Sequence, residues 1–232
     1  MRQGMAHALL AARREARPVV LLTPLDGGLQ RLLDEPGIDL LALTEPELAA
    51  AARAALASDK VQVVGEPGHE VMLAPHNPPL RLVIVGAVHI SEALCAMARA
   101  TGYAVTVIDP RSAFLRPERF PGVQLVNEWP TEAFAQIKPD ARTAVVLLTH
   151  DPKIDDPALL AVLPTPAFYV GALGSTRTHA KRLQRLAEAG VDEASRARIR
   201  GPAGLAIGAR TPSEIAVSVL AEMTQALRLP KA

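Results

Sequence analysis

Cysteine, aromatic residues and charge of one sign are all scarce in this chain of 232 residues. Cys95 is the single cysteine, which excludes an internal disulfide and a structural zinc site built on cysteines. Aromatic residues make up 3% of the chain and the formal net charge is +1. These values do not provide the stacking platforms or the strong positive field that nucleic-acid binding requires, so we expect no nucleic-acid partner.

Long hydrophobic runs are lacking as well. Apolar runs such as Ala144 to Leu148 are far shorter than the ~20 residues that a membrane-spanning helix needs. Residues 1–15 show neither the apolar core nor the cleavage pattern of a secretory signal. We therefore expect no membrane partner and a cytoplasmic location.

The composition is otherwise that of a globular protein, with 49% hydrophobic and 21% charged residues. The segment His76-Asn77-Pro78-Pro79 predicts a domain boundary, because a Pro-Pro pair cannot donate hydrogen bonds to a sheet and keeps the backbone extended. Residues 1–80 carry 7 Lys/Arg and 10 Asp/Glu, whereas residues 81–232 carry 18 and 14. We predict one domain over residues 1–76 and a second over residues 77–232.

The first segment has the pattern of a small α+β domain. A helix is predicted over residues 5–16 and a strand over 18–22, and two short strands at 61–64 and 70–73 flank a Pro-Gly turn and predict a hairpin. Thr44 and Glu47 have the spacing of a capping box, which predicts the start of an alanine-rich helix that runs to Leu56.

The second segment alternates strands and helices without a hairpin signal. Strands are predicted at 82–85, 105–108, 123–126, 144–148 and 168–170, and helices at 90–101, 131–137, 157–163 and 177–189. Thr211 and Glu214 form a further capping box that opens the last helix. This alternation predicts an α/β fold with a parallel sheet covered on both faces.

Ligands of such sheets bind beyond the carboxyl ends of the strands. The residues that follow the predicted strands are therefore the candidate binding residues: Gly86, Val88, His89, Ser91, Asp109, Arg111, Thr149, His150, Asp151, Gly171, Gly174 and Ser175.

The loop after the first of these strands is an incomplete dinucleotide-binding fingerprint. Gly86 occupies the first glycine position, but Val88 and Ser91 replace the second and third glycines. Asp109 stands near the place where a carboxylate would bind ribose hydroxyls, and Arg111 follows closely. Two interpretations stay open: a phosphate-bearing ligand lies at the helix start, or the loop keeps only the fold. The branched side chain of Val88 disfavours tight NAD binding.

The other strand ends also allow two interpretations. His150, beside Asp151, suits a proton carrier or a ligand for a metal or pterin, and His89 is a similar candidate. Alternatively, Asp151 only starts a turn and Asp156-Pro157 opens the following helix. The Gly171–Ser175 turn leads into a basic helix, which is either an anion cradle or a solvated face. The glycine-rich segment 201–210 suggests a binding loop.

Several motifs together resemble one known family. GAVHISEAL (86–94), VTVIDPR (105–111), YVGALGSTRTHAKR (169–182) and IGARTPSEIAVS (207–218) resemble the C-terminal Rossmann-like domain of the XdhC/CoxI family, the xanthine dehydrogenase accessory factors. The resemblance covers about residues 75–228. The family's Gly-Ala-Gly-His loop matches Gly86 to His89, with Val88 in place of a glycine, and residues 1–76 lack the family's Gly-Gly-Cys-x-Glu motif.

The resemblance implies a Rossmann-like domain and a chaperone rather than an enzyme. Such a chaperone binds molybdopterin or its dinucleotide and delivers it to a molybdenum hydroxylase such as xanthine dehydrogenase. The resemblance also implies a sulfur-donating desulfurase and a second copy of the chain as partners. Two alternatives remain: an NAD(P)-dependent oxidoreductase, and a docking platform for hydroxylase maturation that does not touch the cofactor.

Overall fold

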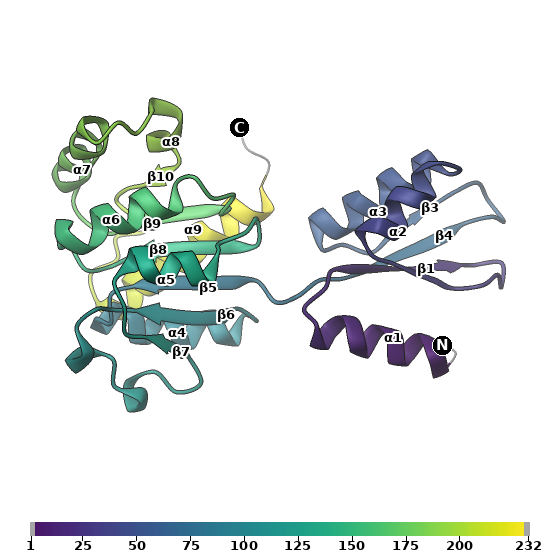
Figure 1. The fold of residues 1–232 in the computed structure, drawn as a ribbon, viewed down its shortest axis with the longest axis horizontal. Helices are drawn as coiled ribbons and strands as arrows, with labels where there is room; N and C mark the ends of the chain where they lie inside the picture. The colour runs from purple at the N-terminus through teal and green to yellow at the C-terminus, as the bar shows by residue number, and fades with distance from the viewer. Residues whose placement is uncertain (1–2, 230–232) are drawn as a thin grey trace. The chain divides into compact units, whose positions relative to one another are not determined.

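The structure is a computed structural model that describes residues 3–229. The chain divides into two compact units, Met1–Pro78 and Pro79–Ala232, and each has a sheet of its own (Figure 1). Among the described residues, no helix is long and apolar enough to cross a lipid bilayer.

The first unit contains a four-stranded antiparallel sheet in the order β2-β1-β4-β3. Its elements are α1 (Gln3–Arg14), β1 (Val19–Pro24), β2 (Arg31–Leu33), α2 (Glu35–Ala42), α3 (Pro46–Ser58), β3 (Gln62–Val64) and β4 (Val71–His76). The core joins β1 and β4 to α2 and α3 through residues such as Leu22, Ile38 and Leu73. The hairpin predicted from the Pro-Gly turn is present as β3 and β4. The sequence did not predict β2 and α2.

The capping box predicted at Thr44 is wrong. The Thr44 hydroxyl donates a hydrogen bond back to the Leu41 carbonyl at 3.4 Å, so Thr44 belongs to the end of α2. The N-cap of α3 is Glu45, whose side chain makes no capping bond, and the helix begins at Pro46. Proline suits this first helical position because its missing N–H would have no partner inside the helix.

The second unit contains six parallel strands, which confirms the predicted α/β class. They are β5 (Arg81–Val85), β6 (Ala104–Ile108), β7 (Gln124–Val126), β8 (Thr143–Leu147), β9 (Tyr169–Ala172) and β10 (Ile199–Arg200). Their order is β10-β9-β8-β5-β6-β7, so the first strand of the unit lies between the second and the fourth. This is the doubly wound order, and its switch point lies between β5 and β8.

Helices cover both faces of this sheet (Figure 1). Leu82 and Ile84 of β5 belong to the core beneath α4 (His89–Ala100) and α9 (Pro212–Arg228). Val83 and Val85 belong to the opposite core, beneath α5 (Pro130–Ile137) and α6 (Pro152–Val162). A strand buried on both faces reads as a continuous apolar run, which explains the pattern at residues 82–85. The remaining helical elements are α7 (Thr176–Glu188), α8 (Glu193–Ala197) and two short 3-10 turns, η1 (Ser112–Phe114) and η2 (Pro117–Arg119).

The start of α6 differs most from its prediction, and the capping box predicted for the last helix is confirmed. The α6 helix begins at Pro152, five residues before the predicted Pro157, and its N-cap is Asp151, whose carboxylate accepts a hydrogen bond from the Lys153 amide at 2.9 Å. Pro157 therefore lies inside the helix. At α9 the capping box is present, because Thr211 Oγ1 accepts from the Glu214 amide and Glu214 accepts from the Thr211 amide.

A buried tyrosine fixes the glycine-rich segment 201–210 to the fold. The Tyr169 hydroxyl donates a hydrogen bond to Glu222 Oε2 at 2.6 Å, and the same oxygen accepts from the Gly204 amide at 2.8 Å. Gly204 has φ +102°, and a Cβ there would lie 2.3 Å from the Ser218 hydroxyl. Burial and the bond to Glu222 raise the pKa of Tyr169, so its hydroxyl remains a donor at neutral pH.

Replacing Tyr169 by phenylalanine should therefore destabilise the second unit by about 1–2 kcal/mol, because the half-buried Glu222 loses a hydrogen-bond donor. Urea unfolding followed by the fluorescence of Trp129, the only tryptophan, reports on this unit. Tyr103→Phe is the matched control: Tyr103 is also buried, and its hydroxyl has no hydrogen bond to another described residue. Equal losses in the two variants would contradict the role assigned to Glu222.

Candidate functional site

The carboxyl ends of β5 and β8 meet at the switch point of the parallel sheet. Gly86 follows β5 with φ +111°, and a Cβ on it would lie 2.7 Å from the Thr149 side-chain methyl, after β8. Only glycine satisfies both the backbone conformation and this close approach. The local packing of the two strand ends is therefore sufficient to explain Gly86, with no pyrophosphate required.

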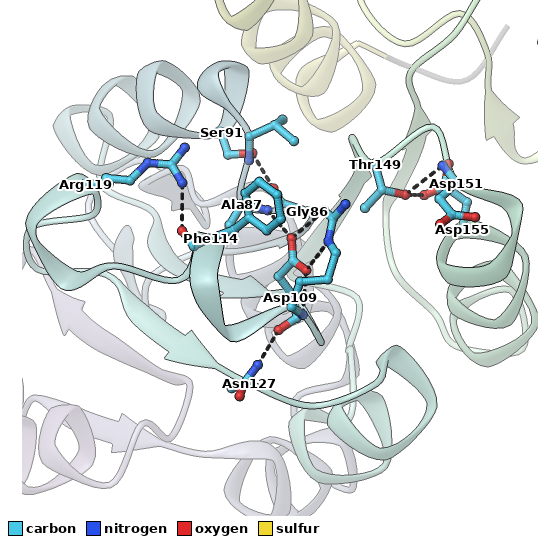
Figure 2. Close-up of polar contacts among 12 residues, drawn as sticks. Gly86, Ala87, Ser91, Asp109, Phe114, Arg119, Asn127, Thr149, Asp151 and Asp155 are labelled. Carbon is cyan, nitrogen blue, oxygen red and sulfur yellow. Dashed lines mark hydrogen bonds and ion pairs between the residues drawn. The ribbon is translucent and has the colours of Figure 1, made fainter.

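The backbone amides of the first loop are already used within the chain. The Gly86 amide donates to the Ile108 carbonyl at 2.8 Å, the Ala87 amide to Asp109 Oδ2 at 2.8 Å, and the Val88 amide to Ser91 Oγ at 3.2 Å. The Ser91 hydroxyl in turn donates to the Gly86 carbonyl (Figure 2). A dinucleotide fingerprint offers such amides to phosphate oxygens, and in this loop these three have other acceptors.

Asp109 is fully buried at the end of β6 and is bound by its own neighbour. The Arg111 guanidinium donates to both carboxylate oxygens at 2.8 Å, and the Arg111 amide adds a bond at 3.0 Å. The same guanidinium lies 4.5 Å from the ring centroid of Phe114. Burial alone would raise the pKa of Asp109, but the hydrogen bonds from Arg111 and from the Ala87 amide outweigh it and hold this pKa below its usual value. A ribose would have to displace Arg111.

Val88 and His89, at the start of α4, differ in their exposure to solvent. Val88 is the N-cap residue, and its side chain packs against the core beneath α4 and α9. The His89 side chain is 87% exposed, and its Nδ1 lies 3.5 Å from Glu92 Oε1. Glu92 also accepts bonds from Arg119. Of these two predicted residues, only His89 presents a polar group to solvent.

Thr149 connects the β8 end to a buried acid that the sequence analysis missed. The Thr149 hydroxyl donates to Asp155 Oδ1 at 2.5 Å and accepts from the Asp151 amide at 3.2 Å (Figure 2). Asp155 Oδ2 lies 3.3 Å from Arg182 Nη2, and both side chains are only 2% exposed. Burial raises the pKa of Asp155, although the hydrogen bond from Thr149 and the charge of Arg182 oppose the shift.

A pocket of about 300 Å³ opens beside this buried pair, between the start of α6 and the side of α7. Its ionisable lining residues are His150, Asp155, Arg177, Lys181, Arg182 and Arg185. His150 is exposed and has φ +60°, a left-handed conformation that places it directly after the β8 end. Four of these six residues are arginine or lysine, so the pocket favours an anionic ligand. We call it the basic pocket.

The predicted residues Gly174 and Ser175 follow β9 and have structural roles at the start of α7, whereas Gly171, predicted to follow the strand, lies within β9. Ser175 is the N-cap and accepts from the Thr178 amide at 3.1 Å. Gly174 has φ +141°, which few other residues adopt. A Cβ on Gly171 would lie 2.6 Å from the Tyr169 ring. Gly174 and Ser175 thus shape the start of the helix that carries the basic pocket, and Gly171 leaves room for the Tyr169 ring.

Asp155 and Arg182 were not among the predicted site residues. A signal for Arg182 exists in the sequence: it lies four residues before Leu186, so both fall on one stripe of α7, and both are buried. A charged residue on the buried stripe of a helix needs a partner. No comparable signal identifies Asp155, because its partner lies 27 residues away on another helix.

Neither metal ligation nor thiol chemistry has support in the described residues. Residues 3–229 contain no cluster of three or more His, Cys, Asp or Glu side chains placed to hold a metal ion. Cys95 is 3% exposed within α4, and burial raises the pKa of its thiol to about 12.

Comparison with family models places most of the second unit in one family. The model described as the XdhC Rossmann domain matches residues 82–223. Its span begins within β5 and ends within α9, so it covers all of the strand ends described above.

Three curated relatives are at least 32% identical to this chain. The molybdenum cofactor insertion chaperone PaoD of Escherichia coli (strain K12) is 38% identical over 147 residues, 63% of this chain and 40% of that protein. The uncharacterized protein YqeB of the same organism is 32% identical over 205 residues, 86% of this chain and 37% of that one. A Bacillus subtilis (strain 168) protein, described as a probable xanthine dehydrogenase subunit, is 33% identical over 150 residues, which are 64% of this chain and 43% of that protein. The chain thus spans about two fifths of their length.

A solved structure agrees with the fold over nearly the whole chain. A crystal structure described as a xanthine dehydrogenase from Bacillus halodurans has a TM-score of 0.60 and 18% identity, and the match covers 97% of this chain and 96% of that one. At this identity the likeness shows the shared fold.

Replacing Gly86 by alanine should destabilise the second unit by about 3 kcal/mol, because the added Cβ meets Thr149 and the positive φ is strained. Gly102→Ala is the control: its φ of +90° is also positive, but nothing lies within 4 Å of an added Cβ. We expect about 1 kcal/mol for the control. Urea unfolding measures both, and equal losses would show that contact with Thr149 contributes nothing.

Replacing Arg111 by glutamine should cost about 2 kcal/mol at pH 7, because Asp109 stays buried with fewer donors. The folded-state pKa of Asp109 lies below its unfolded-state value, so its ionised form stabilises the fold above about pH 4 and this contribution is lost as the pH falls further. The difference between wild type and variant should therefore shrink towards pH 3 in urea unfolding. A difference that is independent of pH would contradict this assignment.

Proposed function

Because the chain belongs to the XdhC Rossmann domain family, we propose that it is an accessory protein in the maturation of a molybdenum hydroxylase. It binds molybdenum cofactor, as molybdopterin or its dinucleotide, at the carboxyl ends of the parallel strands of the second unit and passes it to the enzyme. The names of two relatives support this proposal: one is a molybdenum cofactor insertion chaperone, and the other belongs to a probable xanthine dehydrogenase.

The observation that carries the proposal is the basic pocket beside the β8 and β9 ends. A carrier must hold an anionic cargo and release it, and both tasks are suited to exposed cations around an open pocket. Arg177 and Lys181 are exposed at the lining, and His150 stands where it can donate to a ligand that extends from the pocket towards the β5 end. The cargo is bound and handed on, and no described residue is assigned a bond-making step.

The nicotinamide-dependent oxidoreductase alternative fits the geometry less well. It needs loop amides for the pyrophosphate and a carboxylate for the ribose. Here the amides of Gly86, Ala87 and Val88 have acceptors within the chain, and Asp109 is bound by Arg111. The docking-platform alternative has no feature of the strand ends in its favour, since it leaves the basic pocket without a ligand.

The test is titration of the purified chain with molybdopterin and with its dinucleotide by isothermal calorimetry. We expect micromolar or tighter binding of at least one of them, and about tenfold weaker binding by His150→Ala, because one hydrogen bond to a charged group is lost. His69→Ala is the control, since His69 is an exposed histidine of the first unit.

Three results would contradict the proposal. If neither molybdopterin nor its dinucleotide binds detectably, the carrier mechanism is ruled out. If NADH or NADPH binds instead, as followed by nicotinamide fluorescence, the oxidoreductase alternative is correct. If the chain co-purifies with a hydroxylase while none of these ligands binds detectably, it is a docking platform.

A further inference from the structure

We propose that the basic pocket is a phosphate subsite, which binds the phosphate or pyrophosphate end of an anionic ligand through Arg182, Arg177 and Lys181. Identification of that ligand as molybdenum cofactor rests on the proposed function. The chemistry of the subsite, in contrast, follows from the side chains alone.

The first argument is the unsatisfied hydrogen-bonding capacity of Arg182. Its Nη2 donates to the Leu173 carbonyl at 2.9 Å and lies 3.3 Å from Asp155 Oδ2. Its Nε and Nη1 are buried and have no hydrogen-bond partner among the residues that the structure describes. A buried N–H without an acceptor is costly, and it is costlier still on a charged group. Arg182 also lines the pocket, so an anion that reaches its buried Nε or Nη1 would supply a missing acceptor.

The second argument is the balance of charge around the pocket. The acids near it are already engaged: Asp155 with Arg182, and Asp156 with Arg185 through two bonds of 2.6 and 2.9 Å. Arg177 and Lys181 have no carboxylate within 4 Å among the described residues. The pocket therefore carries about two positive charges that no neighbouring side chain offsets.

The third argument is the spacing of these cations along α7. Arg177, Lys181 and Arg185 follow one another at intervals of four residues, so they share one face of the helix. Like charges at this spacing destabilise a helix. A bound dianion between α7 and the start of α6 converts that repulsion into attraction. Arg177 also lies in the first turn of α7, where the helix dipole adds to the attraction for an anion.

The size of the pocket indicates how much of a ligand it holds. Its volume of about 300 Å³ lies at the lower limit of small-molecule sites. It suits a phosphate or pyrophosphate group and not a whole dinucleotide. The remainder of the ligand would extend past His150 towards the β8 and β5 ends, which keeps the subsite continuous with the proposed cargo site.

Calorimetric titration of the full chain with sodium pyrophosphate at low ionic strength tests the subsite without the cofactor. We expect wild type to bind pyrophosphate. We expect the single variants Lys181→Ala and Arg177→Ala each to bind it about tenfold more weakly, because each removes one exposed cation from the lining. Lys138→Ala is the matched control: it removes an exposed lysine of the same unit that precedes β8, at the amino end of the strands. The control should bind as wild type does, and binding should weaken with added salt.

Arg182→Lys tests the buried guanidinium and preserves the charge beside Asp155. We expect its thermal midpoint to stay close to that of wild type, and its pyrophosphate affinity to fall at least as far as that of Lys181→Ala, because lysine cannot reproduce the guanidinium geometry. If Arg182→Lys unfolds, Arg177→Ala and Lys181→Ala still decide the question. Absence of pyrophosphate binding by wild type at millimolar concentration overturns the subsite, and so do equal affinities in the two exposed-cation variants and in Lys138→Ala.

A competition experiment separates this inference from the proposed function. If molybdopterin binds, and pyrophosphate displaces it from wild type, both are supported. If molybdopterin binds with an affinity that the pocket variants do not change, the basic pocket is not part of the cargo site, and the carrier function stands without it. If pyrophosphate binds through Lys181 while molybdopterin does not, the subsite stands, and another phosphate-bearing compound is its ligand.

Discussion

The buried carboxylate of Asp109 is the constraint on which the arrangement of the strand ends depends. It joins the loop after β5, through the Ala87 amide, to the segment after β6, through Arg111. The Asp109 carbonyl accepts a bond from Asn127, which ties in the residues after β7 (Figure 2). Three neighbouring strand ends are thereby held together by groups that a nucleotide would otherwise use. The capacity to bind an anion lies instead on the other side of the switch point, beside β8 and β9.

The two buried acids at the carboxyl ends of the parallel strands differ in how many hydrogen bonds they receive. Asp109 receives four hydrogen bonds from Ala87 and Arg111, and together they lower its pKa despite burial. Asp155 receives fewer, its pKa is raised by burial, and its partner Arg182 retains donors without acceptors. An ion pair whose hydrogen-bonding groups are all satisfied has no donor left for a ligand. An ion pair with unsatisfied donors, beside a cavity, can accept an anionic ligand. This contrast separates a structural ion pair from a candidate binding group.

The sequence predicted the layout of the sheet but not the pairings that decide the site. Strands buried on both faces produce apolar runs such as 82–85, which are visible without a structure, and strand ends follow from them. Two Asp-Pro pairs, at Asp151 and Asp156, give the same helix-start signal, and local patterning favoured the wrong one. The strand β10 has two residues, which is too short to produce a recognisable pattern of hydrophobic residues. That Arg111 turns back onto Asp109, and that Arg182 reaches Asp155 across 27 residues, depends on tertiary packing.

The position of Cys95 has a consequence for sulfur chemistry. A protein that receives a sulfur atom as a persulfide needs an accessible thiolate. Cys95 is the only cysteine of this chain, it is buried within α4, and its thiol has a pKa of about 12. At neutral pH this thiol is therefore protonated and shielded, so Cys95 does not offer the accessible thiolate that takes up sulfur from a donor. If the cargo is sulfurated while it is bound here, the sulfur reaches it without passing through Cys95.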